Sequence, residues 1–315
     1  MPENHRREAA RTRNPMTQDL DVVDAHMHLW DLKRIRYPWL TPPLPVGITG
    51  DVSPIARDYL LDDYLDDASR GGVRVRKIVH IEAGALPADA LAETQWLQSL
   101  ADERGCPQAI VAHAELEKAG AAELLERHAA HPKVRGIRQI LNWHPDPAKT
   151  YTPRDLLADE AWWAGFARLK RHGLSFDLQI YPAQMPAAAR LASRHPDITL
   201  ILNHTGMPVA KDEAGIEVWR GGMRLLAAQP NVAVKISGLA MLDWHWSRQS
   251  LRPFVLETLE IFGAERTMIA SNFPVDRLFG AFSDFYAAYT RILAGASAAE
   301  RANLFSDTAE RIYRI

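Results

Sequence analysis

The stretch Val22-Val23-Asp24-Ala25-His26-Met27-His28-Leu29-Trp30 decides how the rest of the chain is interpreted. A short apolar strand ends there in two histidines that are two residues apart. Side chains two apart on a strand point to the same face, so His26 and His28 should project together toward a metal, a substrate carbonyl or each other. The pair predicts a barrel enzyme whose first strand ends in the active site. The alternative is a chance pair of buried, hydrogen-bonded histidines.

Apolar segments rich in β-branched residues recur along the chain and alternate with amphipathic segments. The expected strands are 21–29, 75–82, 109–116, 134–141, 175–181, 198–204, 232–237 and 267–273. The expected helices include 88–103, 119–130, 160–172, 186–194, 218–228 and 253–262. This alternation predicts parallel βαβ units, and eight such units predict a single-domain α/β protein, a (β/α)8 TIM barrel with its site at the carboxyl ends of the strands. An open doubly wound sheet is the alternative, but it calls for a glycine-rich phosphate loop after the first strand, which the sequence lacks.

The composition narrows the class of protein and its partners. The 315 residues are 47% apolar and 24% charged, which is typical of a folded globule. The net charge of −2 indicates neither nucleic acid nor an anionic membrane as a partner. The single cysteine, Cys106, leaves no internal disulfide and no cysteine metal cluster. The partner is therefore expected to be a small molecule.

The ends of the chain and its apolar runs bear on location. No apolar run reaches the roughly 18 residues of a membrane-spanning helix. Residues 1–18 are rich in Arg, Asn and Pro without an apolar core, so we interpret them as a flexible leader before a domain at 19–315, and not as a secretory signal. A cytoplasmic protein is expected, and a homo-oligomer is compatible with the sequence.

Polar side chains collect at the last positions of the expected strands. They are His26 and His28; His80 and Glu82; His113 and Glu115; Arg135, Arg138 and Gln139 with Asn142 and His144 following; Asp177 and Gln179; Asn203 and His204; Lys235 and Ser237; Ser271 and Asn272. Buried parallel strands ordinarily read as near-continuous apolar runs. Polar groups at so many strand ends therefore predict a site, although any one of them can instead be a satisfied buried group.

The opening segment, continued by Tyr37-Pro38-Trp39-Leu40, resembles the start of the amidohydrolase superfamily and its lactonase-like branch, which includes fuconolactonase, rhamnonolactonase and 2-pyrone-4,6-dicarboxylate lactonase. Further matching segments follow in order at 93–97, 134–138, 202–208, 234–238 and 270–276. The ordered set is specific even though no single segment decides. The resemblance implies a distorted (β/α)8 barrel that hydrolyses the carboxylic ester of a small lactone, derived from a sugar acid or a dicarboxylate.

The resemblance also implies roles for individual residues. The first-strand pair of the family corresponds to His26 and His28, and its sixth-strand histidine to His204. Arginines that grip substrate carboxylates after the fourth strand of the lactonases correspond to Arg135 and Arg138. Their odd spacing puts these two on opposite faces of a regular strand. Arg138 is favoured for anion binding, with a planar fork that matches a carboxylate.

One position departs from the family pattern. The eighth strand of the family usually ends in Ser-Asp-Trp-Pro, with an aspartate that binds the metal where one is present and activates the water; this chain has Asn272 there. A carboxamide cannot accept a proton at neutral pH and is a poor metal ligand beside a carboxylate. The fifth-strand histidine of metal-dependent members is also missing. We therefore expect that no cofactor is required, and that a single zinc, if bound, uses His26, His28 and His204.

The expected reaction is attack of water on a lactone carbonyl. His26, His28 and His204 would polarise the carbonyl and stabilise the oxyanion. The base that takes the proton from water would be Asp276, the nearest acidic residue after Asn272, or Glu82 at the end of the second strand. Asp276 can alternatively pair with Arg277 or a neighbouring loop.

Several residues are candidates for substrate binding beside Arg138 and Arg135. They are Asn142, His144, Asn272 and Trp244. Trp244 belongs to an aromatic loop at 243–246 that either shelves a ring-shaped substrate or packs against 37–39. The Pro- and Gly-rich stretch 41–51 predicts a long surface loop suited to a lid.

Two other functions compete with lactone hydrolysis. Related barrels of the superfamily are decarboxylases, a lyase class, but they resemble this chain less at 37–40 and depend on a metal that Asn272 would weaken. A catalytically silent, ligand-binding relative is the third hypothesis, motivated by Asn272 itself. The many polar strand ends argue against it.

Overall fold

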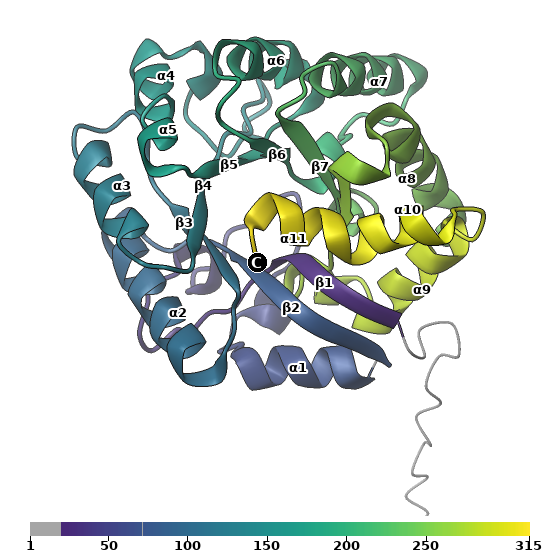
Figure 1. Cartoon of the computed structure of the whole chain (residues 1–315), viewed down its shortest axis with the longest axis horizontal. Helices are drawn as coiled ribbons and strands as arrows, with labels where there is room; N and C mark the ends of the chain where they lie inside the picture. Colours follow the sequence, from purple (N-terminus) through teal and green to yellow (C-terminus); the bar gives the residue numbers. More distant parts are fainter. Residues whose placement is uncertain (1–19, 71) are drawn as a thin grey trace, which may run out of the picture.

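The computed structural model describes residues 20–70 and 72–315, so the leader predicted at 1–18 lies outside the described residues. Within these ranges, eight parallel strands form one sheet in the order β1 to β8. They are β1 (Leu20–Met27), β2 (Val73–Ile81), β3 (Ala109–His113), β4 (Val134–Ile140), β5 (Ser175–Gln179), β6 (Leu200–Leu202), β7 (Val232–Ile236) and β8 (Thr267–Ile269). The predicted single-domain barrel is confirmed (Figure 1).

The ring closes between β1 and the segment that follows β8. The Asn272 amide donates to the His26 carbonyl at 2.8 Å, and the His28 amide donates to the Phe273 carbonyl at 2.8 Å. Asn272 itself has a φ of +56°, in the left-handed region that few residues other than glycine adopt. Closure thus brings the histidine pair directly beside Asn272.

Helices form the outer layer around the barrel in Figure 1, except for the C-terminal helix, which lies across one of its openings. The helices are α1 (Leu61–Arg70), α2 (Ala90–Arg104), α3 (Ala121–Ala129), α4 (Glu160–Phe166), α5 (Leu169–His172), α6 (Met185–Arg194), α7 (Glu213–Ala227), α8 (Arg248–Phe262), α9 (Phe282–Ile292), α10 (Ala298–Ala302) and α11 (Thr308–Tyr313). The helix expected from residue 253 begins at Arg248, because the Ser247 hydroxyl caps it by accepting from the Ser250 amide at 3.1 Å.

Part of the barrel interior is filled by an apolar cluster. Its buried side chains are Val23, Ala25, Val79, Ile81, Ala109, Val111, Ile201, Ala233, Met268 and Ala270. Ala309 and Tyr313 of α11 belong to the same cluster. Figure 1 shows this yellow C-terminal helix lying across the opening of the barrel. The last helix therefore plugs the end opposite to the predicted site.

An irregularity in β1 sets the direction of the histidines. The pairing of β1 with β2 shifts between Asp24 and Met27, which marks a β-bulge. Ala25 packs inside the barrel, and His26 also reaches the side chains inside it, whereas Met27 packs in the layer beneath the helices. The Asp24 carboxylate turns outward to the Tyr64 hydroxyl of α1, which donates to it at 2.7 Å.

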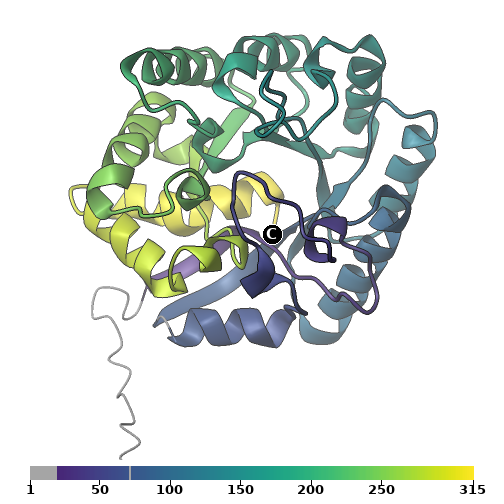
Figure 2. The same ribbon diagram turned by 180° about the vertical axis from the view of Figure 1, so that it is seen from behind.

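Loops cover the other opening, where the strands end. The loop after β1, drawn in dark purple, lies across it in Figure 2. The loop expected at 41–51 is held there, since the Trp244 indole N–H lies 3.2 Å from both the Ile48 and the Met241 carbonyl oxygens. A buried apolar cluster of Tyr181, Met207, Met241 and Val275 also comes from these loops, and we call it the roof.

Candidate active site

Three histidines meet at the carboxyl end of the barrel. The ring centroids of His26 and His28 are 5.0 Å apart, and those of His26 and His204 are 4.6 Å apart. His204 reaches this position through a sharp turn after β6, in which His204 and Thr205 have φ values of +53° and +55°. Such left-handed conformations cost energy in residues other than glycine and often accompany functional sites. The predicted grouping of the three histidines is thus present in the structure.

His28 and His204, the two histidines on either side of His26, differ in the hydrogen-bonding groups that they present to a ligand. The His28 Nδ1 lies 2.8 Å from the Ile81 carbonyl oxygen, which only accepts, so Nδ1 carries the proton and Nε2 keeps its lone pair. The His204 Nδ1 lies 3.0 Å from the Ser237 hydroxyl, which can donate or accept, so His204 can present either a proton or a lone pair at Nε2.

His26 lies between two cationic side chains. The Arg138 Nη1 is 3.5 Å from its Nε2, and the Lys235 Nζ is 3.5 Å from its Nδ1. Burial, followed by the charges of Lys235, His204, His28 and Arg138, lowers the pKa of His26 well below its ordinary value. His26 therefore stays neutral and is unsuited to take up a proton during a reaction.

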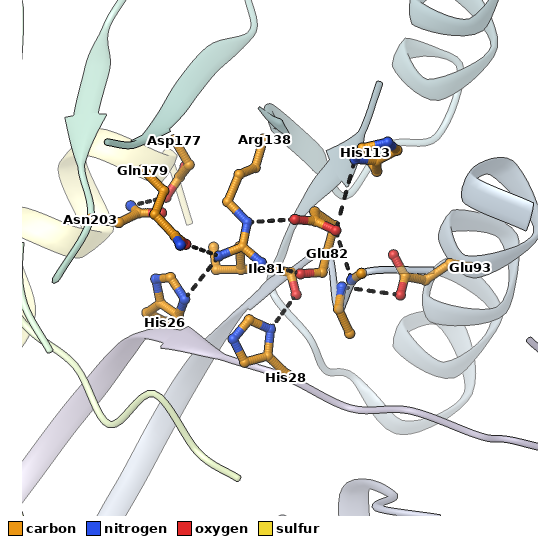
Figure 3. A network of polar contacts seen from close by, with 12 residues as sticks. His26, His28, Ile81, Glu82, Glu93, His113, Arg138, Asp177, Gln179 and Asn203 are labelled. Carbon is orange, nitrogen blue, oxygen red and sulfur yellow. Dashed lines mark hydrogen bonds and ion pairs between the residues drawn. The ribbon is translucent and has the colours of Figure 1, made fainter. Parts of the chain in front are cut away.

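Arg138 and Glu82 form a buried ion pair on the β2–β4 side of the opening (Figure 3). The Arg138 Nε donates to Glu82 Oε1 at 2.6 Å, Nη2 to the Glu82 carbonyl at 2.5 Å, and Nη1 to Gln179 Oε1 at 3.2 Å. Burial acts to raise the pKa of Glu82, but the charge and hydrogen bond of Arg138, together with the hydrogen bond from the Gly84 amide, outweigh it and lower that pKa. A carboxylate held in its ionised form by a cation is a weak base.

Asp276 has the opposite surroundings. It is 1% exposed, its Oδ1 accepts from the Asn272 side-chain amide at 2.8 Å, and its Oδ2 has no hydrogen-bond partner. Burial raises the pKa of Asp276 to about 8. The alternative pairing with Arg277 does not occur, because Arg277 lies 3.3 Å from Asp67. Asp276 is thus a carboxyl group poised to exchange a proton near neutral pH.

Gly238 lies against the His204 ring, and its backbone amide acts to lower the pKa of Asp276, against the larger effect of burial. A Cβ at Gly238 would come within 2.5 Å of the His204 ring, and this glycine has a φ of +60°. A side chain at this position would therefore push the histidine and the backbone apart.

The structure does not bring every predicted substrate-binding residue to the histidines. Arg135 lies at the amino end of β4 and donates to the Pro132 carbonyl, so the structure does not bring it to the histidines, as its odd spacing from Arg138 indicates. His144 accepts from the Asp146 amide of its own loop and packs edge-on against Tyr181. Asn272 supports Asp276 through its side-chain amide.

Asn142 and Trp244 lie around the roof. Asn142 is buried, contacts the Met207 sulfur at 3.4 Å and leaves its Oδ1 without a partner. Trp244 is 52% exposed and packs on Gly50, so it contacts the 41–51 loop. Together with Ile48 and Met241, Trp244 lines an open hollow of about 440 Å³ on the outer side of the roof.

Sequence reasoning missed residues on the β5–β7 side. Lys235, Asp177 and Gln179 were noted only as polar residues of their strands, and Tyr313 was not noted at all. Lys235 donates to Asp177 at 2.5 Å beside His26. A buried lysine in an expected interior strand was the signal that could have singled this pair out.

The donor set does not fit a catalytic zinc as arranged here. Such a site normally takes three protein ligands. Both ring nitrogens of His26 face cations, which leaves the Nε2 atoms of His28 and His204 and the Asn272 side-chain oxygen, a poor metal ligand beside a carboxylate. Among the described residues, no group of three or more His, Cys, Asp or Glu side chains is placed to hold a metal ion.

The comparisons with known proteins address the family. A protein-family model described as amidohydrolase matches residues 23–315. The chain belongs to the amidohydrolase family. The predicted resemblance is confirmed, and this amidohydrolase is an enzyme of the hydrolase class.

Relatives of this amidohydrolase cover most of its length. An uncharacterized protein of Sinorhizobium fredii is 43% identical over 298 residues, covering 94% of this chain and 99% of the relative. An L-fucono-1,5-lactonase of Burkholderia multivorans is 29% identical over 314 residues, covering 93% and 96%. A crystal structure of a Burkholderia multivorans amidohydrolase with bound zinc superimposes with a TM-score of 0.76 at 27% identity, covering 93% and 99%. In the part of the amidohydrolase that the structure describes, no helix is long and apolar enough to cross a membrane.

Proposed function

We propose that this amidohydrolase opens a small lactone, the cyclic ester of a sugar acid or of a dicarboxylate, in the cytoplasm. The observation that carries the proposal is the meeting of three neutral histidines and two cations in one buried centre, with a buried carboxyl group of raised pKa joined to it through Asn272, whose backbone amide donates to the His26 carbonyl and whose side chain donates to Asp276. Ester hydrolysis needs a proton acceptor for water and donors for the oxyanion. The similarity to L-fucono-1,5-lactonases supports this choice of ester.

Asp276 is the proposed base. Its unpaired Oδ2 accepts the proton of the attacking water, and its raised pKa matches that task near neutral pH. The Asn272 amide keeps the other oxygen occupied, so the side chain is held in one orientation. Glu82, which has a lowered pKa and is bound to Arg138, instead orients the guanidinium.

His26, His204 and Arg138 are the proposed electrophilic side. Arg138 keeps an Nη1 group near His26, where it can donate to the substrate carbonyl oxygen or to a carboxylate. The lone pair at His28 Nε2 accepts from water or from a substrate hydroxyl, so His28 is better suited to orient the nucleophile than to polarise the carbonyl. No step of this proposal uses a metal.

The hollow above the roof is the proposed approach for substrate. His28 and His204 keep 4% and 2% of their surface exposed, whereas His26 has none, so the outer two would meet an entering ring first. Trp244 offers an aromatic face beside this approach, suited to the apolar face of a sugar-like or pyrone ring.

A panel of lactones tests the function. Aldonolactones, muconolactones and pyrone dicarboxylates are assayed by acid release, each with and without a chelator, and a reaction without enzyme gives the uncatalysed rate. We expect one class to be opened well above the uncatalysed rate by the unmodified enzyme alone. Release of CO2 from aromatic or muconate acids without opening of any lactone would instead assign a decarboxylase.

A further inference from the structure

A second buried ion pair lies beneath the histidines. The Lys235 ammonium of β7 donates to Asp177 Oδ1 of β5 at 2.5 Å, and both side chains are fully buried. The Asn203 side-chain amide donates to the same oxygen at 2.9 Å. Burial of two charges is costly unless hydrogen bonds satisfy them, and hydrophobic residues of similar size would often be as stable. The pair therefore calls for an explanation beyond stability.

The C-terminal helix takes part in this pair. The Tyr313 hydroxyl of α11 lies 3.0 Å from both carboxylate oxygens of Asp177. The Lys235 Nζ also lies 5.0 Å from the centre of the Tyr313 ring, a cation–π distance. Lys235 is thus fixed from two directions, by the carboxylate that Tyr313 holds and by the Tyr313 ring.

The remaining contact of Lys235 is with His26. A lysine ammonium only donates, and a neutral imidazole has a single nitrogen with a lone pair. Lys235 at Nδ1 and Arg138 at Nε2 are both donors, so only one of them can be bonded to His26 in a given tautomer. If Lys235 takes the lone pair at Nδ1, the ring proton sits on Nε2 beside the Arg138 Nη1.

We propose that Lys235 is a positioning residue, held by Asp177 and Tyr313, that directs the lone pair of His26 to Nδ1 so that His26 Nε2–H and Arg138 Nη1 form a donor pair for the oxyanion of the reaction. Two donors 3.5 Å apart cannot satisfy each other, but both can reach one oxygen at hydrogen-bond distance. This inference rests on the proposed ester hydrolysis for its role, whereas the tautomer that it requires is a property of the free protein.

The tautomer is measured without substrate. In protein labelled with ¹⁵N at histidine, we expect the His26 signals of an unprotonated Nδ1 and a protonated Nε2. Tyr313→Phe, which keeps the ring and removes the hydroxyl, should shift His26 toward the other tautomer or a mixture. The matched control is Tyr286→Phe, because Tyr286 is an equally buried tyrosine whose hydroxyl has no partner. A proton on Nδ1 of His26 in the unmodified protein would overturn the proposal.

Kinetics on the lactone identified by the panel provide the second measurement. We expect Tyr313→Phe to lower kcat by about tenfold, the order expected for losing one hydrogen bond to a charged group, with KM nearly unchanged. Lys235→Met should lower kcat further, and Lys235→Arg, which restores a donor, should recover part of it. Should Lys235→Met fail to fold because Asp177 loses its partner, the milder Tyr313→Phe still decides.

The outcomes separate this inference from the proposed function. If no lactone is opened, the proposed function fails, and the histidine spectra still test the positioning. If a lactone is opened and Tyr313→Phe keeps both the tautomer and kcat, the positioning is wrong. A Tyr313→Phe protein with a lower melting temperature and an unchanged kcat would show that Lys235, Asp177 and Tyr313 have only a structural role.

Discussion

The two sides of the barrel opening each hold a buried carboxyl group, and they treat it in opposite ways. On the β2–β4 side, Glu82 is bonded to the Arg138 guanidinium at 2.6 Å, and its pKa is lowered. On the β6–β8 side, Asp276 has only amide donors and an unpartnered oxygen, and its pKa is raised to about 8. The comparison teaches that burial alone does not set the chemistry of a carboxyl group. A neighbouring cation keeps a buried carboxyl group ionised and makes it a weak base, whereas a buried carboxyl group without a cation has a raised pKa and is suited to act as a base.

The contrast between the two carboxyl groups requires that Asp276 is needed for turnover. We expect Asp276→Asn to lower kcat by roughly a hundredfold to ten-thousandfold, the usual worth of general-base catalysis, with little change in folding because the side chain keeps its size. Stopped-flow acid release on the best lactone measures it. Near-normal turnover by this variant would show that Asp276 is not the base. His204, which can take either tautomer, would then be the next candidate.

Glu82→Gln should mainly affect stability. It leaves the buried Arg138 without its carboxylate, and breaking such a pair costs about 3–5 kcal/mol. Urea unfolding followed by tryptophan fluorescence measures the loss, with Glu82→Gln/Arg138→Met as a control that removes both charges and should recover much of it. A Glu82→Gln protein of normal stability that is catalytically dead would place the base on β2.

Arg138→Ala tests whether the guanidinium on the β2–β4 side binds an anionic group of the substrate. A lost hydrogen bond to a charged group costs roughly 1.5–3 kcal/mol, about tenfold to a hundredfold in kcat/KM. We expect this loss for lactones that carry a carboxylate and a clearly smaller one for neutral lactones. Steady-state kinetics on one lactone of each kind decide, and equal losses would show that Arg138 does not bind the anion.

The pH dependence of turnover reports on the Asp276 side. A base acts in its ionised form, so the raised pKa of Asp276 means that kcat increases with pH and levels off above about 8. Below that value each pH unit costs about tenfold. A rising limb near pH 4, the ordinary range of a carboxyl group, would contradict the assignment and would match a carboxylate such as Glu82 better.

The smallest effect is expected from a chelator. His26 faces cations at both ring nitrogens and Asn272 supplies no carboxylate, so dialysis against EDTA should leave kcat unchanged. Metal analysis of the dialysed protein accompanies the assay. Asn272→Asp is the matched variant, since it adds a carboxylate beside His26 and His28 and should raise the retained zinc. Stoichiometric zinc in the unmodified protein, with activity lost on its removal, would contradict this prediction.

The sequence predicts the barrel and the histidine cluster well because both depend on local patterns. The strand and helix periods correctly predict the barrel. The spacing of two residues between His26 and His28 correctly brings them together despite the bulge in β1, and the odd spacing between Arg135 and Arg138 correctly separates these two. These features need no knowledge of distant partners.

The rest of the site depends on partners far apart in the chain. Glu82 and Asp276 read alike in sequence, and only the position of Arg138 distinguishes them. Tyr313 belongs to a short C-terminal helix with no site pattern, yet it contacts Asp177. The sequence left open whether Trp244 shelves a substrate or packs against 37–39, and the structure shows it in contact with the loop at 48–50 while part of its ring stays exposed beside the hollow.

The contact of Trp244 with that loop constrains the residue type at some positions of the loop and not at others. Its indole N–H lies near the backbone carbonyls at positions 48 and 241, which any residue supplies. Its ring, in contrast, covers Gly50, where a Cβ would come within 2.8 Å. Positions 50 and 244 should therefore vary together during evolution, a glycine accompanying the tryptophan, while the side chain at position 48 drifts without regard to either.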